Sequence, residues 1–69
     1  MFVRQLVRMV HDKGYVSIED KSFNVITEGE AKTVLANKII HGLGVDYFYT
    51  GRRNRRYCTV IVVSKKAGE

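Results

Sequence analysis

Four arginines within five residues, Arg52, Arg53, Arg55 and Arg56, form the densest cluster of charge in the chain. Side chains of one sign held this close repel one another and gain nothing from packing, whereas phosphate-binding surfaces are built from such clusters. The cluster therefore predicts contact with a polyanion. The alternative interpretation is a solvated loop that only keeps the protein in solution.

The other residue types that could perform chemistry do not converge. His11 and His41 fall on different predicted helices, and the sequence holds no acid–histidine–nucleophile set and no glycine-rich phosphate loop. Cys58 is the only cysteine, and its alternation with Val60 and Val62 is typical of a packed thiol. We expect a protein that is not an enzyme and that holds no metal, cofactor or small-molecule ligand.

Length and composition indicate one folded domain. The 69 residues are 45% hydrophobic and 28% charged, and no apolar run approaches the ~20 residues of a membrane span. A single cysteine allows no internal disulfide, and no signal-peptide pattern opens the chain. We therefore expect an intracellular, cytoplasmic location.

The net charge of +5 is concentrated in the C-terminal part of the chain. Residues 1–44 carry a balance of +1, and residues 45–69 carry a balance of +4. This asymmetry favours a nucleic acid or an anionic membrane as partner, and charge alone does not separate the two.

Two runs rich in β-branched and aromatic residues, Val45–Thr50 and Tyr57–Ser64, flank the arginine cluster. Gly51 and Asn54 tolerate the positive φ that a chain reversal needs, so the pattern predicts a β-hairpin with a basic tip. Alternation gives two faces for each strand. We expect the buried face to hold Phe48, Cys58, Val60 and Val62.

The N-terminal segment has the spacing of an amphipathic helix over residues 2–13, with Gly14 as its stop. Its apolar stripe consists of Phe2, Val3, Leu6, Val7 and Val10. A short strand is predicted over residues 15–18.

Two further helices are predicted from capping patterns. Ser17 followed by Asp20 resembles a capping box for a helix over residues 18–24, although residues 22–26 could instead form a strand. Thr27 with Glu30 predicts the start of a third helix, which continues to about His41. A helical wheel turns Ala31, Leu35 and Ile39 toward the core and leaves Ile40, an apolar residue, facing outward.

This order of elements resembles the winged helix-turn-helix superfamily. The passage GYVSIED at residues 14–20 resembles the family's path from first helix through first strand into second helix, and GLGV at residues 42–45 resembles its entry into the wing. The resemblance covers residues 2–63. It implies an α+β winged-helix domain over residues 1–64, with three helices, a short strand and a C-terminal two-stranded hairpin, followed by a polar tail over residues 65–69.

The resemblance further implies a sequence-specific or architectural protein that binds double-stranded DNA, such as a small transcriptional regulator, and not a membrane. The third helix would enter the major groove, with Thr33, Asn37 and His41 toward base edges and Lys32 and Lys38 near phosphates. Asn37 is the preferred base reader, because an amide can form two hydrogen bonds with adenine. The wing would follow the backbone or enter the minor groove with residues Arg52, Arg53, Asn54, Arg55 and Arg56.

The oligomeric state and two other functions stay open at this point. A homodimer would have only the N-terminal helix available as an interface, and a monomer is the other option. Exposed tyrosines such as Tyr47, Tyr49 and Tyr57 could stack on unpaired bases, which favours RNA or ribonucleoprotein binding as an alternative. A protein-interaction module is the third possibility, since fold does not fix function.

Overall fold

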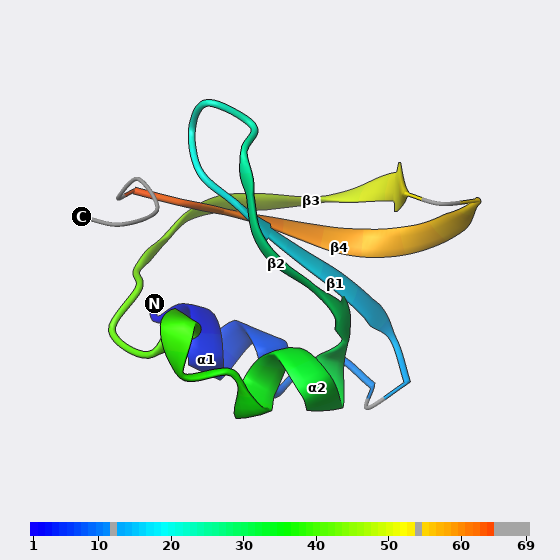
Figure 1. The fold of residues 1–69 in the computed structure, drawn as a ribbon, viewed down its shortest axis with the longest axis horizontal. Helices are drawn as coiled ribbons and strands as arrows, with labels where there is room; N and C mark the ends of the chain where they lie inside the picture. Colours follow the sequence, from blue (N-terminus) through cyan, green and yellow to red (C-terminus); the bar gives the residue numbers. More distant parts are fainter. Residues whose placement is uncertain (12, 54, 65–69) are drawn as a thin grey trace.

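A four-stranded mixed β-sheet with short helices on one side forms the architecture of this protein (Figure 1). The computed structural model describes residues 1–11, 13–53 and 55–64. The strand order is β2-β1-β4-β3, in which β1 and β4 are parallel and the two outer pairs are antiparallel. The elements in chain order are α1 (Val3–Val7), β1 (Tyr15–Glu19), β2 (Val25–Glu30), α2 (Ala31–Ala36), the 3-10 turn η1 (Lys38–Ile40), β3 (Val45–Arg53) and β4 (Arg56–Val63).

The three-helix winged-helix architecture expected from the sequence is therefore wrong. The described residues form two short α-helices and more sheet than that fold would contain. The part of the expectation that is confirmed is the C-terminal hairpin, because β3 and β4 pair in antiparallel fashion from Val45 and Val63 to Arg53 and Arg56.

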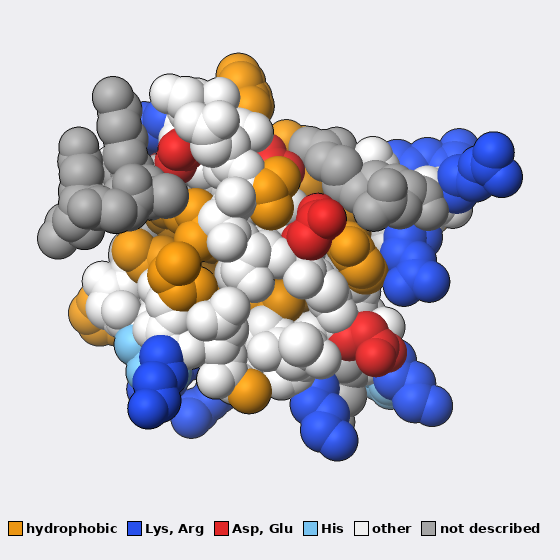
Figure 2. All heavy atoms as spheres, in the orientation of Figure 1, with side chains coloured by type: hydrophobic (Ala, Val, Ile, Leu, Met, Phe, Trp, Pro, Cys, Tyr) orange, Lys and Arg blue, Asp and Glu red, His pale blue; other side chains and the backbone are white. Residues whose placement is uncertain are grey.

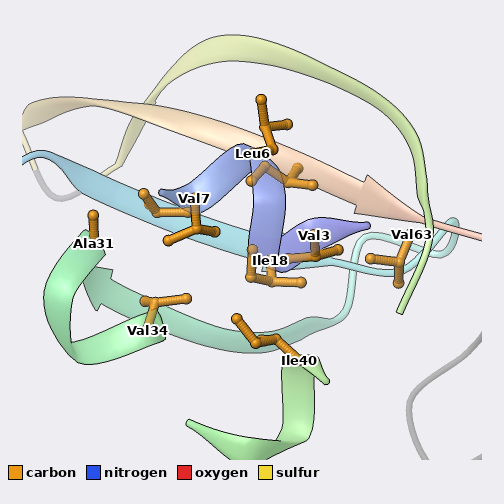
Figure 3. Close-up of a cluster of buried hydrophobic side chains, with 10 residues drawn as sticks. Val3, Leu6, Val7, Ile18, Ala31, Val34, Ile40 and Val63 are labelled. Atoms are coloured by element: carbon orange, nitrogen blue, oxygen red, sulfur yellow. The ribbon is translucent and has the colours of Figure 1, made fainter. Parts of the chain in front are cut away.

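Strand β4 is central because its apolar residues are buried on both faces. Ile61 and Val63 contribute to a cluster beneath the sheet, while Val60 and Val62 are buried on the other face together with Cys58. Figure 3 shows the first cluster, in which side chains from α1, α2 and η1 converge on those of β1 and β4. The expectation that Cys58, Val60 and Val62 are buried is confirmed, although burial is not restricted to their face.

The first helix is shorter than the residue 2–13 span that its pattern predicts. Val3, Leu6 and Val7 are buried as the apolar stripe requires, but the helix ends at Val7 and Phe2 is exposed. The chain then turns toward Gly14, whose N–H donates to the His11 carbonyl (2.7 Å). A Cβ at Gly14 would lie 2.7 Å from Val10 Cγ1, so the close approach requires glycine here.

The predicted helix over residues 18–24 is wrong. Ser17 lies inside β1 with no exposure, and its hydroxyl donates to Glu19 Oε2 (3.1 Å) instead of capping a helix. The loop that follows is organised by Asp20, whose Oδ1 accepts from the N–H groups of Ser22 (2.8 Å) and Asn24 (3.0 Å). Carboxylate bonds of this kind favour turns over helices. The alternative strand interpretation is closer to the structure, because β2 begins at Val25.

The predicted third helix breaks into three pieces. Residues 25–30 form β2, α2 covers only residues 31–36, and η1 follows a break at Asn37, whose ψ is 119°. Thr27 does not cap this helix, because it lies in β2 opposite Ile18 and its hydroxyl accepts from the Asn37 side chain (3.2 Å). The β-strand thus overrides the capping pattern because pairing with buried β1 stabilises it more than one turn of helix would.

The break at Asn37 also explains why the helical wheel misplaces two isoleucines. Ile39 is expected in the core and is 50% exposed, whereas Ile40 is expected outside and is fully buried. A chain that leaves the α conformation at Asn37 restarts with a different rotation, so the 100° step no longer applies beyond Ala36. The apolar character of Ile40 is thereby accounted for.

Phe48 is expected in the core and is 56% exposed. It lies opposite Ile61, on the face that the helices cover, but on the edge strand β3. The tail over residues 65–69 lies outside the described residues, so its expected boundary at residue 64 stays a prediction. Across residues 1–11, 13–53 and 55–64, no helix is long and apolar enough to cross a membrane.

Candidate nucleic-acid interface

The end of the β3–β4 hairpin projects beyond the rest of the sheet. Strand β1 accompanies β4 only from Cys58 onward, so Arg56 and Tyr57 have β3 as their one neighbouring strand among those described. Figure 1 shows this two-stranded end extending along the long axis of the molecule, away from the helices. We call it the hairpin end and define it as residues 50–53 and 55–57.

Arginines leave both faces of the hairpin end. Arg52 lies opposite Tyr57, and its Cζ is 5.7 Å from the centre of that ring. Arg56 lies on the other face, where its Cζ is 5.2 Å from the centre of the Tyr15 ring. Stacking on a ring orients a guanidinium through its flat face and does not use its N–H donors. The two tyrosines therefore help to present arginine donors at the surface.

The turn at the tip is made partly by an arginine. Arg55 has a φ of 65°, a conformation expected for Asn54 or Gly51, whereas Gly51 is paired with Cys58 inside the hairpin. Asn54 lies outside the described residues, and so does the side chain of Arg53, whose backbone pairs with Arg56. Three of the four clustered arginines, Arg52, Arg55 and Arg56, are exposed.

The hairpin contains no carboxylate close to this charge. The sequence from Tyr47 to Ser64 contains no Asp or Glu, and Figure 2 shows basic side chains gathered at the projecting end. Asp46 precedes the run and lies 3.6 Å from Lys21 Nζ at the opposite end of β3. A projecting, exposed cluster on a hairpin without carboxylates concentrates positive potential where a polyanion can approach.

The residues predicted to read DNA from a third helix are not arranged for that role. Lys32 and Thr33 are exposed on α2, Lys38 is exposed in η1, and His41 follows it. With six residues, α2 is about 9 Å long, and these positions do not share one helical face because the helix ends at Ala36.

Asn37, the preferred base reader, is engaged within the protein. Its Oδ1 accepts from the N–H of Ile39 (3.0 Å), and its Nδ2 donates to Thr27 Oγ1 (3.2 Å). Both ends of the amide thus hold η1 against β2. A two-bond contact with adenine would require these bonds to break.

The structure does not bring the two predicted groups together. In Figure 1, η1 (residues 38–40) and the hairpin end lie toward opposite ends of the long axis, so the basic tip and the proposed base readers are not neighbours. The hairpin arginines are the only group of predicted site residues that the described structure gathers in one place.

A second basic surface was not predicted from the sequence. The helical layer, defined here as residues 1–11 and 31–44, contains Arg4, Arg8, Lys32 and Lys38 and no Asp or Glu. Arg4 and Arg8 line a shallow hollow of about 400 Å³ together with Phe2, Gln5 and Gly42. The absence of carboxylates from both segments is the signal that could have identified this surface.

The sheet face opposite the helices carries a partly exposed aromatic pair. The rings of Tyr47 and Tyr49 stack with their centres 6.3 Å apart and their planes at 23°. These residues lie opposite Val62 and Val60, on the face where Cys58 is also buried. Among the residues described, no group of three or more His, Cys, Asp or Glu side chains could hold a metal ion.

Comparisons with known proteins add no family to these observations. No protein-family model matches the sequence, no curated protein matches it, and no solved structure matches it. The function is therefore argued from the hairpin end and its charges.

Proposed function

We propose that this protein binds double-stranded DNA through the hairpin end of β3 and β4, used as a two-stranded β-ribbon. The observation that carries this proposal is the exposed set Arg52, Arg55 and Arg56 on a projecting hairpin that contains no carboxylate after Asp46. The hairpin takes the place of the helix that the sequence had suggested as the DNA-contacting element.

The dimensions of a β-ribbon support a duplex as the ligand. The major groove of B-DNA is about 12 Å wide and admits either an α-helix or a two-stranded ribbon. Arginines that leave both faces of such a ribbon can reach the phosphates on either side of the groove, and Arg55 at the tip extends the contact. Phosphate contacts supply affinity without sequence preference, so the protein would act as an architectural protein or as a small transcriptional regulator.

A salt titration tests this function. The affinity of the full chain for a random duplex, measured by fluorescence anisotropy at several salt concentrations, should fall linearly on logarithmic axes. In the variant Arg55→Asn/Arg56→Ala, the slope should decrease by about 0.9 for each phosphate that the protein no longer neutralises. Asparagine at position 55 tolerates the positive φ found there, so the turn is retained.

The matched control is Arg4→Ala/Arg8→Ala, which removes the same charge from the helical layer. Its salt slope should stay within error of the wild type. A hairpin variant with an unchanged slope, or a control variant with an equal decrease in slope, would contradict the proposed role of the hairpin end.

One observation favours single-stranded RNA as a second candidate ligand. Tyr47 and Tyr49 are 47% and 37% exposed and stack side by side, and bases of a single strand stack on such rings. Competition between a random duplex and single-stranded RNA of equal length separates the two candidates. Binding of neither at low salt would favour a protein-interaction module.

A further inference from the structure

The two edges of the sheet differ in how well they are protected from a further strand. Strand β2 has six residues, a register irregularity opposite Glu19, a glycine at φ 149° and exposed carboxylates at Glu28 and Glu30. Short length, irregularity and charge are devices that keep an edge from pairing. This edge is therefore poorly suited to a partner strand.

Strand β3 has such devices only near its ends, a register irregularity between Val45 and Tyr47 and the charged residues Asp46, Arg52 and Arg53, and its central stretch from Tyr47 to Gly51 has neither. Of the described segments, only the N-terminus reaches its outer edge, where the Val45 N–H donates to the Met1 carbonyl (2.9 Å) and Phe2 bridges Gly44. Beyond Val45 no described strand covers that edge, since β3 is the last strand in the sheet order. A long unpaired edge offers a row of backbone donors and acceptors to another strand.

The exposed side chains near the centre of this edge are aromatic. Tyr47 and Phe48 are 47% and 56% exposed on opposite faces of the sheet, and Tyr49 follows. Three consecutive large aromatic side chains in a solvent-exposed edge strand leave apolar area that pairing would cover on both faces.

We propose that β3 pairs with β3 of a second copy of this chain, in antiparallel fashion and centred on Tyr49, to form a continuous eight-stranded sheet. Charge complementarity selects this occupant and this register. In an antiparallel pair related by a two-fold axis, directly opposite residues lie on the same face, so a symmetric register is centred on a residue.

The regular ladder of β3 begins at Tyr47, so Asp46 lies at the irregularity next to its end. The register centred on Tyr49 brings this Asp46 end of each copy to Arg52 of the other. Phe48 then lies opposite Thr50, and the two copies of Tyr49 face each other. A register centred on Phe48 would place Asp46 opposite Thr50 and would form neither ion pair. Opposite charges across a strand pair are favourable and like charges are unfavourable, so the charge pattern of β3 favours the register centred on Tyr49.

The dimer has a consequence for DNA contact, and this consequence rests on the proposed function. Arg55 lies one position beyond the Arg53–Arg56 pair, which is four positions from the Tyr49 centre. The two copies of Arg55 would therefore be ten strand positions apart, or about 33 Å at 3.3 Å per residue. One turn of B-DNA is about 34 Å, so both tips could contact the same side of one duplex.

Charge reversal tests the dimer without DNA. Sedimentation equilibrium of the wild type over a range of concentrations should show a monomer–dimer equilibrium. The variants Asp46→Arg and Arg52→Asp each create two like-charge contacts and should weaken dimerisation about tenfold, whereas the double variant should restore it. Asp46 and Arg52 are about 20 Å apart within one strand, so restoration cannot arise inside a monomer. Lys21→Ala is the control, because it removes the ion pair of Asp46 and should leave dimerisation unchanged.

Cross-linking provides a second test that does not depend on charge. Tyr49→Cys places two thiols opposite each other across the two-fold axis, at a spacing that a disulfide can bridge, so oxidation should yield a covalent dimer. Glu28→Cys on the edge of β2 is the matched control and should form no covalent dimer under the same conditions.

Three results would overturn the proposal: a wild type that is monomeric at all concentrations, a double variant that does not recover, or a covalent dimer of Glu28→Cys. The last result would show that two copies pair through β2. Because these measurements contain no DNA, they stand apart from the salt titration of the hairpin variant, and either proposal can fail without the other.

Discussion

The hairpin end and the helical layer each contain four basic residues and no carboxylate, yet the two regions arrange these charges differently. The hairpin end gathers Arg52, Arg53, Arg55 and Arg56 on one projecting turn, whereas the helical layer distributes its charges over α1, α2 and η1. Elements of the helical layer bury apolar residues against the sheet, and the hairpin end buries few. The comparison teaches that the number of charges alone does not locate a binding surface. The charges must also be close together, and the element that carries them must be free of a role in the hydrophobic core.

The largest expected effect concerns the free energy of unfolding. It distinguishes the helical layer, which contributes to the core, from the hairpin end, which is exposed. Ile40→Ala removes a fully buried side chain from η1 and should lower the free energy of unfolding by about 2–5 kcal/mol. Arg56→Ala at the exposed hairpin end removes the cation–π contact with Tyr15 and should change it by less than about 1 kcal/mol. Urea denaturation measures both. Equal decreases would show that the hairpin end is also part of the folding core.

The next effect concerns affinity for duplex DNA. At 0.15 M salt, Arg55→Asn/Arg56→Ala should weaken binding about thirtyfold if the variant leaves two phosphates without an arginine, because each neutralised phosphate contributes about 0.9 to the salt slope. Arg4→Ala/Arg8→Ala should weaken it less than about threefold through the general decrease in positive potential. Parallel anisotropy titrations measure the ratio, and a reversed order would assign the DNA surface to the helical layer.

A smaller effect tests whether Asn37 serves structure or recognition. Asn37→Ala removes the bonds to Thr27 and Ile39, so the free energy of unfolding should fall by about 1 kcal/mol. The salt slope and the preference among duplex sequences should not change. A variant of normal stability that loses a sequence preference would instead restore the base-reading role predicted from the sequence.

The smallest effect concerns the ring that orients Arg52. Tyr57→Leu removes the stacking partner of the guanidinium while keeping an apolar side chain, and exposed cation–π contacts contribute about 0.5–1 kcal/mol. We expect duplex affinity to fall about two- to fivefold with an unchanged salt slope, because the charge remains. A shallower slope would indicate that Tyr57 positions more than one arginine.

The hairpin could be predicted from the sequence because its signals are local. Alternating apolar residues, a reversal and an arginine cluster all lie within residues 45–64, and β3 and β4 are neighbours in both sequence and space. Strand β1 could also be predicted, over residues 15–18, but its central place in the sheet could not, because its parallel partner β4 is distant in the sequence.

The segment from Ser17 to His41 could not be predicted because its capping patterns are compatible with both a helix start and a strand. A serine or threonine three residues before an acidic residue caps a helix, but Ser17 and Thr27 lie in strands and make other bonds. Pairing of β2 with a buried β1 decides between helix and strand, and this is a tertiary interaction. For the same reason, only part of the candidate site could be predicted. Its arginines can be identified from the sequence, but the helix expected beside them does not form.

The parallel pair of β1 and β4 determines how this chain can fold. Tyr15 pairs with Cys58, which is 43 positions later in the chain, and the remaining pairs of these strands keep the same separation. Contacts so distant in sequence raise contact order, and loop-closure entropy must be overcome before they stabilise anything. On the ribosome, the α1–β1–β2–α2 segment would therefore lack its central neighbour until β4 has left the exit tunnel, so stable folding of this segment has to await β4.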